Sequence, residues 1–314
     1  MISKEVIFNS IKYVVDNSKH VSIDRSKISD VIKLIHPKEH SSWIDDNEMK
    51  YTDEQKIIYL VLCESLNFCY WDSDVKWKIE YNGNWYSGSY GLCYAISKAI
   101  KNGHDLLNID YLDNITIDEF DDIFKGTTTI PLLKERFEIV KTLAKELKGI
   151  PNLKELFNVK DDIELLNVII NNFSNFKDIS IYKGKNIYFF KRAILLVGDL
   201  IDNVPYIKEK VKNNNNMLGC ADYKIPQVLR HLGVLNYFPV LSNLVDSKKQ
   251  IPHDSEEEIE IRANMLYIIE LMKKEMNKEK TSINSVQIDN ALWLLSKNDE
   301  FKNKPHHLTK TIYY

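Results

Sequence analysis

The apolar residues of this chain recur mainly three and four positions apart, which is the spacing of one face of an α-helix. Runs of this kind cover residues 57–66, 131–147, 161–173 and 256–276. Three segments also have the form of a capping box, in which a Ser or Thr and a later Glu or Gln satisfy the first free amides of a helix. These segments are Thr52–Gln55, Thr116–Glu119 and Ser255–Glu258. The pattern predicts a mainly α-helical protein.

Two short stretches instead alternate apolar and polar residues, as β-strands do. In the first, residues 75–79 alternate up to Asn82-Gly83, a dipeptide that accepts the positive φ of a tight turn. In the second, residues 181–189 surround Lys183-Gly184. We expect one or two small β-hairpins on a compact helical body.

No clear linker divides the 314 residues. The composition, 44% hydrophobic and 28% charged, is typical of a globular protein with a sizeable core. We therefore expect a single domain over residues 1–314. An N-terminal helical subdomain over residues 1–125 is the alternative.

The charge balance limits the partners of the protein. Lys and Arg number 42 against 45 Asp and Glu, which gives a formal net charge of −3, and no basic stripe is present. Such a surface offers a polyanion no attractive field, so we expect no stable complex with nucleic acid. The chain shows neither a signal peptide nor an apolar run of about 20 residues, so we expect a soluble protein without membrane contact.

The four cysteines do not have the spacing of a metal site. Cys63, Cys69, Cys93 and Cys220 lie among apolar or aromatic residues and form no C-x-x-C pair. We interpret them as reduced thiols of a cytoplasmic, or also nuclear, protein. We expect no metal and no cofactor. The sequence leaves the oligomeric state open.

Asp222 is the first candidate for chemistry, since the common catalytic motifs are missing from the sequence. It lies just before a short predicted helix that has Pro226 in its first turn and ends at Gly233. Its carboxylate can cap that helix. The alternative is a partly desolvated carboxylate on a rigid support, where little water screens its charge and electrostatic stabilisation is strong.

Two further segments place charged side chains among apolar ones. Lys191 and Arg192 interrupt an apolar stretch, and they either pair with carboxylates such as Asp199 or bind a phosphate group. Asp289 lies among apolar residues on a predicted helix. It is either a helix-surface residue or a buried carboxylate that binds a guanine-like edge, whose ring N–H and amine donate side by side.

Aromatic residues are concentrated in residues 66–71 and recur at Trp85, Tyr86 and Tyr90. Such clusters usually belong to the hydrophobic core. The alternative is a stacking wall for a planar base, because every nucleobase offers a π-face.

Seven segments carry a resemblance to a known family. In chain order they are LNFCYW, YSGSYGLCYAI, FFKRAILLVGDL, CADYKIPQVLRHLGVL, EIEIRA, IDNALW and the terminal HHLTKTIYY. Together they resemble the queuosine salvage protein family, the queuosine 5′-phosphate N-glycosylases, over nearly the whole chain from about Asn67 onward. The resemblance implies a helical fold related to helical DNA glycosylases. It also implies hydrolysis of queuosine 5′-phosphate to queuine and ribose 5-phosphate, and a salvage role that returns queuine to tRNA modification.

The resemblance further implies roles for individual residues. Asp222 corresponds to the catalytic aspartate of the family's Phe-Ala-Asp-Tyr segment, Asp289 to the aspartate that recognises the base, and His40 to the binding histidine of the N-terminal region. For the 5′-phosphate, charge and position along the chain favour three cations, Lys191, Arg192 and Arg262.

Three positions depart from the family pattern. Cys220 stands where the family usually has phenylalanine, Asn290 where a tyrosine is common, and Leu294 where an aspartate is frequent. We expect Cys220 and Asn290 to lie at the substrate, with the contacts to the base rearranged. The alternative to an enzyme is a noncatalytic helical module that binds queuine or nucleic acid.

Overall fold

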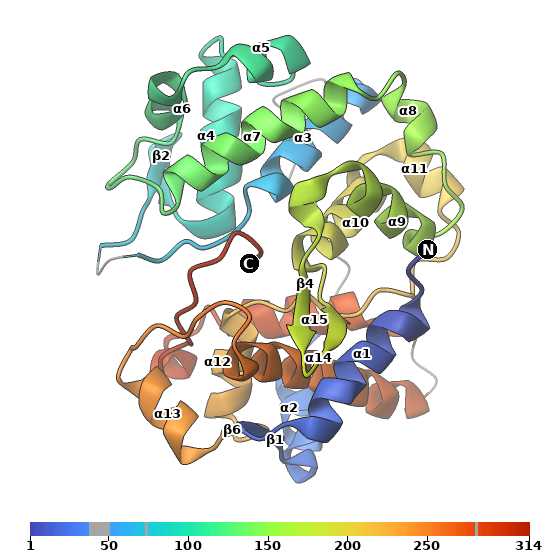
Figure 1. Ribbon diagram of the computed structural model, residues 1–314, viewed down its shortest axis with the longest axis vertical. Helices are drawn as coiled ribbons and strands as arrows, with labels where there is room; N and C mark the ends of the chain where they lie inside the picture. The colour runs from blue at the N-terminus through green and yellow to red at the C-terminus, as the bar shows by residue number, and fades with distance from the viewer. Residues whose placement is uncertain (38–50, 73–74, 280–281) are drawn as a thin grey trace. The chain divides into compact units, whose positions relative to one another are not determined.

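The computed structural model describes residues 1–37, 51–72, 75–279 and 282–314 (Figure 1). Within these ranges it contains fifteen α-helices and three two-stranded antiparallel sheets. The prediction of a mainly α-helical protein is therefore confirmed. None of the described helices combines the length and the apolar character that a bilayer crossing requires.

The chain folds into two compact units, each built from separate stretches of sequence. The first unit consists of residues 1–41, 178–194 and 213–310, and the second of residues 42–177, 195–212 and 311–314. The chain therefore passes from one unit to the other five times. This division differs from an N-terminal subdomain over residues 1–125, and the single domain over residues 1–314 stays a prediction.

Helix α14 (Glu256–Met276) is the centre of the first unit. Residues 258–266 are all buried, and the helix contacts α1 (Lys4–Asn17), α2 (Ile28–Leu34), α12 (Lys224–His231) and α15 (Ser285–Leu295) (Figure 1). The other elements of this unit are β1 (Val21–Ile23), β4 (Ile179–Tyr182), β5 (Lys185–Tyr188), the start of α10 (Lys191–Asn203), β6 (Leu235–Tyr237) and α13 (Pro239–Asp246). Because α14 is enclosed, its charged residues need partners inside the protein.

Helix α7 (Leu133–Lys148) has the corresponding place in the second unit, where it contacts α3 (Asp53–Ser65), α5 (Ile109–Asn114) and α6 (Ile117–Ile123). The unit also contains β2 (Ile79–Tyr81), β3 (Asn84–Tyr86), α4 (Gly88–Lys101), α8 (Leu153–Leu156), α9 (Asp162–Asn172), the remainder of α10 and α11 (Pro205–Lys210). Four 3₁₀ turns complete the described elements: Arg25–Lys27, Ser174–Phe176, Asn277–Glu279 and Asp299–Lys302.

The helix starts follow the predicted caps only in part. At Thr52 the capping box is complete, because the side chain of Gln55 returns the bond to the Thr52 amide. At Thr116 and Ser255 the hydroxyl caps the helix as expected, but the glutamate three residues later binds other side chains. A cap can therefore be predicted locally, whereas the partner of a long acidic side chain depends on the tertiary fold.

Both predicted hairpins are present. Strands β2 and β3 pair Ile79 with Tyr86, and the turn between them has φ of 49° at Asn82 and 77° at Gly83. Strands β4 and β5 pair Ile179 with Tyr188 around a second turn of the same kind. The third sheet, β1 with β6, was not predicted, because its strands are three residues long and more than 200 residues apart in sequence.

A fully buried arginine holds the second unit together near residues 66–69. From α7, the guanidinium of Arg136 donates to the carbonyls of Pro131 (2.9 Å) and Cys69 (3.0 Å), and also to those of Leu66 and Phe68. The ring of Phe68 lies 4.1 Å from the guanidinium carbon. Phe68, part of the aromatic run of residues 66–71, is therefore a core residue that packs under a cation.

We expect Arg136→Met to lower the free energy of unfolding by about 3–5 kcal/mol, because four buried carbonyls lose their donor. Urea denaturation followed by circular dichroism measures the change. The control is Lys148→Met on the same helix, since Lys148 pairs with Asp110 and Asp113 at the surface, where ion pairs contribute little. Equal denaturation midpoints for the two variants would contradict the structural role of Arg136.

Candidate active site

Two aspartates of the first unit, Asp222 and Asp289, are brought together by the loop before α12. Asp289 is on α15, a helix that begins with a capping box between Asn284 and Gln287. The Asp289 carboxylate accepts a hydrogen bond of 2.7 Å from the backbone amide of Cys220, two residues before Asp222. Both aspartates are buried, with 9% of Asp222 and 7% of Asp289 exposed. Of the two interpretations of Asp289, the buried carboxylate is the one the structure shows.

The carboxylate of Asp222 caps helix α12 with one oxygen. Its Oδ1 accepts from the amides of Lys224 (3.0 Å) and Ile225 (2.9 Å). Among the described residues, no hydrogen bond reaches the other oxygen, Oδ2. The capping interpretation and the desolvated-carboxylate interpretation therefore both apply. The two amides fix the orientation of the carboxylate through Oδ1.

Burial raises the pKa of both carboxyl groups, and repulsion from Asp222 raises that of Asp289 further. For Asp222, burial raises the pKa above its usual 3.8, while the amide of Ile225 and the charge of Lys191 oppose the change. For Asp289, burial raises the pKa well above 3.8, and the charge of Asp222 raises it further. The amide of Cys220 and the charge of Lys191 act in the opposite direction. The two acids are thus coupled, and one lysine stabilises the ionised form of both.

Gly219 makes the contact between the two segments possible. A Cβ atom on this residue would lie 2.6 Å from Cδ1 of Ile269 and 2.8 Å from Oδ2 of Asp289. Both distances are shorter than real Cβ contacts. A residue without a side chain is therefore required for Asp289 to reach the Cys220 amide. Gly219 was not among the predicted site residues, although an isolated glycine can indicate close backbone approach.

The three predicted phosphate-binding cations differ in their surroundings. Lys191 and Arg192 are the first two residues of α10, and both are buried. The charge of Lys191 reaches both aspartates. Arg262 on α14 is fully buried and forms internal ion pairs with Asp178 and Glu258. The structure thus brings Lys191 into the site, and it surrounds the Arg262 guanidinium with protein groups.

The remaining predicted positions lie in different parts of the site or outside it. His40 falls outside the described residues. Cys220 is buried, and its backbone amide is the group that contacts Asp289. Asn290 follows Asp289 on α15 and is half-buried, and Leu294, one turn later, is 48% exposed.

Two features near the aspartates were missed. The ammonium of Lys297 lies 3.6 Å from the ring centre of Trp293, and it is close enough to Asp222 for the two charges to interact. The ring of Tyr223 packs against His306 at 4.7 Å between ring centres. The approach of Lys297 to Asp222 and the Tyr223–His306 contact join segments that are distant in sequence, so no local pattern indicates them.

Two groups of side chains in the first unit have the composition of metal ligands, and neither includes Asp222 or Asp289. They are His20, Glu256 and Glu260, and His253, Asp254 and Glu258. The carboxylates of the two groups also have protein partners. Glu260 accepts three backbone amides, and Glu258 pairs with Arg262.

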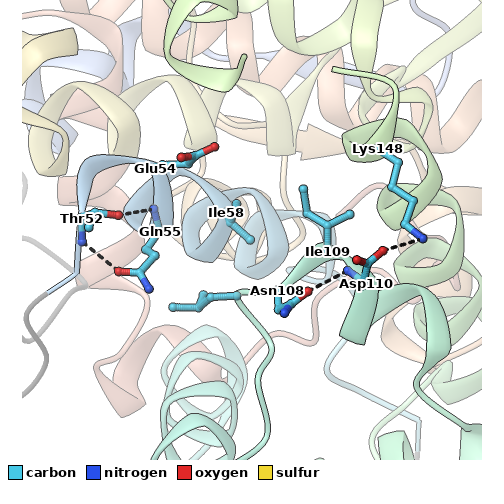
Figure 2. A pocket seen from close by; sticks show the side chains of 9 residues that line it. Thr52, Glu54, Gln55, Ile58, Asn108, Ile109, Asp110 and Lys148 are labelled. Atoms are coloured by element: carbon cyan, nitrogen blue, oxygen red, sulfur yellow. Dashed lines mark hydrogen bonds and ion pairs between the residues drawn. The ribbon is translucent and has the colours of Figure 1, made fainter. Parts of the chain in front are cut away.

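A cavity of about 570 Å³ in the second unit lies between the N-terminal ends of α3 and α5 (Figure 2). Five of its polar side chains bind one another or the start of their own helices. Thr52 and Gln55 form the capping box of α3, Asn108 caps α5, and Lys148 pairs with Asp110 at 2.9 Å. The cavity contains neither Asp222 nor Asp289, and we do not assign the reaction to it.

Comparison with known proteins identifies the family. The sequence model of the queuosine salvage protein family matches residues 47–314. A protein of Sphaerobacter thermophilus named queuosine 5′-phosphate N-glycosylase/hydrolase is 29% identical to this chain, over 98% of this chain and 97% of its own length. Proteins with the same name from Bos taurus (29% identical, 97% of both chains) and Schizosaccharomyces pombe (27%, 93% of this chain and 91% of the other) are also similar. With the match spanning most of its length, this chain belongs to the queuosine salvage protein family.

Proposed function

We propose that this protein hydrolyses the N-glycosidic bond of queuosine 5′-phosphate and releases queuine and ribose 5-phosphate. The observation that carries the proposal is the Asp222 carboxylate, which is buried and held through Oδ1 by two amides, with no hydrogen bond from the described residues to Oδ2. A second buried carboxylate lies beside it. The names of the relatives support the substrate, since each is called a queuosine 5′-phosphate N-glycosylase/hydrolase.

In this reaction Asp222 is the catalytic residue. Cleavage of the bond between C1′ and the base nitrogen builds positive charge on the sugar, and an ionised carboxylate in a site with little water stabilises that charge strongly. Water supplies the hydroxyl group that C1′ acquires, and Oδ2 of Asp222 orients this water and accepts its proton. The proton finally resides on the nitrogen of the released base, so the products are queuine and the free sugar phosphate.

Asp289 is the proposed recognition group for the base. Queuine is a 7-deazaguanine and has no N7 that could be protonated, so contacts at the guanine-like edge have to assist its departure. The ring N–H and the exocyclic amine of that edge donate side by side to an ionised carboxylate. The Cys220 amide fixes the orientation of the Asp289 group. We assign the side chains of His40, Cys220 and Asn290 to the surroundings of the base.

We assign the 5′-phosphate to Lys191 and Arg192 at the start of α10, and no longer to Arg262. The charge of Lys191 already acts on both aspartates. Arg262 is taken up by Asp178 and Glu258, so a phosphate would have to displace buried ion pairs to reach it.

The released queuine is then available for tRNA modification, which is the cellular role that we propose. The four cysteines, all among the described residues, are buried and form no disulfide, which supports a reducing compartment, the cytoplasm or also the nucleus.

We expect Asp222→Asn to fold, because the amide oxygen can still cap α12, and to lose turnover by about 10³-fold or more. Chromatography of released queuine measures the rate, and calorimetry with queuosine 5′-phosphate shows whether the variant still binds. Release of queuine at nearly the wild-type rate would refute the mechanism. A wild-type protein that binds the nucleotide without cleaving it would instead be a noncatalytic binding module.

The raised pKa values predict how activity depends on pH. Both carboxylates have to be ionised, so activity is present above their pKa values and is lost as pH falls through them. We expect the acid limb of kcat/KM to lie clearly above pH 3.8 and to fall with the slope of two protons. In Asp289→Asn the limb should move to lower pH and fall with the slope of one proton. An unchanged limb in this variant would show that Asp289 does not titrate in the site.

Gly219→Ala should weaken substrate binding more than it slows the chemical step. The added methyl group displaces either the Asp289 carboxylate or Ile269, and such overpacking costs about 1–3 kcal/mol. We expect KM to rise by about tenfold with a smaller change in kcat. Gly198→Ala is the control, because a Cβ atom on that helical glycine meets nothing within 4 Å. Equal KM values for the two variants would remove Gly219 from the recognition of the base.

A further inference from the structure

Asp178 and Arg262 form a buried ion pair beside the site. The contact is bidentate, with Nη1 of Arg262 3.1 Å from Oδ1 and Nη2 2.6 Å from Oδ2 of Asp178. Both side chains are almost fully buried. Geometry of this kind gives a well-defined orientation, because two parallel N–H···O bonds fix both planes.

Asp178 also holds the corner at which α10 begins. Its carbonyl accepts the amides of Phe189 (3.1 Å) and Phe190 (3.3 Å), and its Oδ2 accepts the amide of Lys191 (3.3 Å). Phe190 has a φ of 51°, a conformation that is rare for a bulky residue and requires support from its surroundings. Asp178 therefore fixes the position of the Lys191 backbone.

Arg262 holds the other side of the site. Its Nε donates to the carbonyl of Ala221 at 3.2 Å, and Ala221 is the residue directly before Asp222. The guanidinium carbon lies 3.9 Å from the ring centre of Phe189, so the same aromatic residue that enters the α10 corner also supports the arginine.

We propose that the Asp178–Arg262 pair is a positioning device that sets the distance between Lys191 and Asp222. The inference rests on the proposed function, because it assigns a role in that reaction to two residues that do not touch the substrate. The pair binds the Lys191 amide at one end and the Ala221 carbonyl at the other. A shift of about 1 Å in a catalytic group can cost about 10²-fold in rate. Loss of this rigid link should therefore lower the turnover rate.

Glu258 provides a matched control. It is also buried, and its Oε1 lies 3.4 Å from Nη1 of the same guanidinium. Among the described residues, its side chain contacts neither the Lys191 amide nor the Ala221 carbonyl. Asp178→Asn and Glu258→Gln each remove one negative charge from Arg262, and only the first alters a contact to the site.

We expect Asp178→Asn to lower kcat by about 10–100-fold and to move the acid limb of kcat/KM to higher pH, because Lys191 then stabilises the ionised aspartates less. Glu258→Gln, with a similar loss of stability in urea, should keep kcat within about threefold of the wild type and leave the limb in place. Equal losses of kcat in the two variants, with neither limb moved, would overturn the proposal.

Arg262→Lys tests the contact between the arginine and the Ala221 carbonyl. This variant also keeps the proposal testable if Asp178→Asn does not fold. A lysine keeps the charge beside Asp178 but cannot also reach the Ala221 carbonyl, so kcat should fall by about tenfold while substrate affinity stays unchanged. A wild-type kcat would show that the Ala221 contact has no role in positioning.

Failure of the proposed function can be recognised separately. NMR titration of the Asp222 and Asp289 carboxyl carbons requires no turnover, and we expect higher pKa values in Asp178→Asn than in Glu258→Gln. If the wild type does not cleave queuosine 5′-phosphate but this difference is seen, the positioning device stands and the reaction has to be reassigned. Equal titrations in the two variants would reject the device itself.

Discussion

The first unit depends on the way in which the buried charge of Arg262 is satisfied. A guanidinium inside a protein is tolerated only if other groups replace its water. Asp178 and Glu258 neutralise it, and the carbonyl of Ala221 accepts its Nε–H. These partners come from the β4–β5 hairpin, from α14 itself and from the loop before α12. Because these groups all have to meet at one guanidinium, the positions of the hairpin and of the loop on the central helix are fixed. Apolar packing alone specifies these positions less sharply.

A second charge on the same helix has a similar effect on the N-terminal part of the unit. Glu260 is fully buried, and its carboxylate accepts the amides of Lys19, His20 and Val21 and the hydroxyl of Tyr182. The three amides lie between α1 and β1, and β1 pairs with β6 shortly after α12. The segment EIEIRA thus carries alternate charged residues that organise three separate chain segments, and this explains why a helix with so many charges lies in the core.

The sequence predicts the local features of this fold and few of the long-range ones. Helical spacing, the cap at Thr52 and the Asn82-Gly83 turn could be predicted because their interactions lie within a few residues of each other. The capping role of Asp222 could be predicted for the same reason, because the Ile225 amide that it accepts is only three residues away in sequence. The β1–β6 sheet, the Asp178–Arg262 pair and the close approach at Gly219 could not, because each depends on segments that meet only in the folded chain. Arg262 is an example. From its charge and its position along the chain it was predicted to bind the 5′-phosphate, whereas in the structure it pairs with Asp178, 84 residues away in sequence.

The difference between backbone and side-chain contacts affects how the family pattern can change at this site. The contact from position 220 to Asp289 is made by the backbone amide, and every residue except proline supplies that group. A cysteine in place of phenylalanine therefore keeps the backbone contact that orients the Asp289 carboxylate. Asn290 is half-buried and Leu294 is 48% exposed on α15, so a change at either position replaces a side chain and leaves this backbone contact in place. In the proposed reaction, cleavage then depends on Asp222 and on backbone groups that these departures leave intact, and the preference for a particular base depends on the residues that have changed.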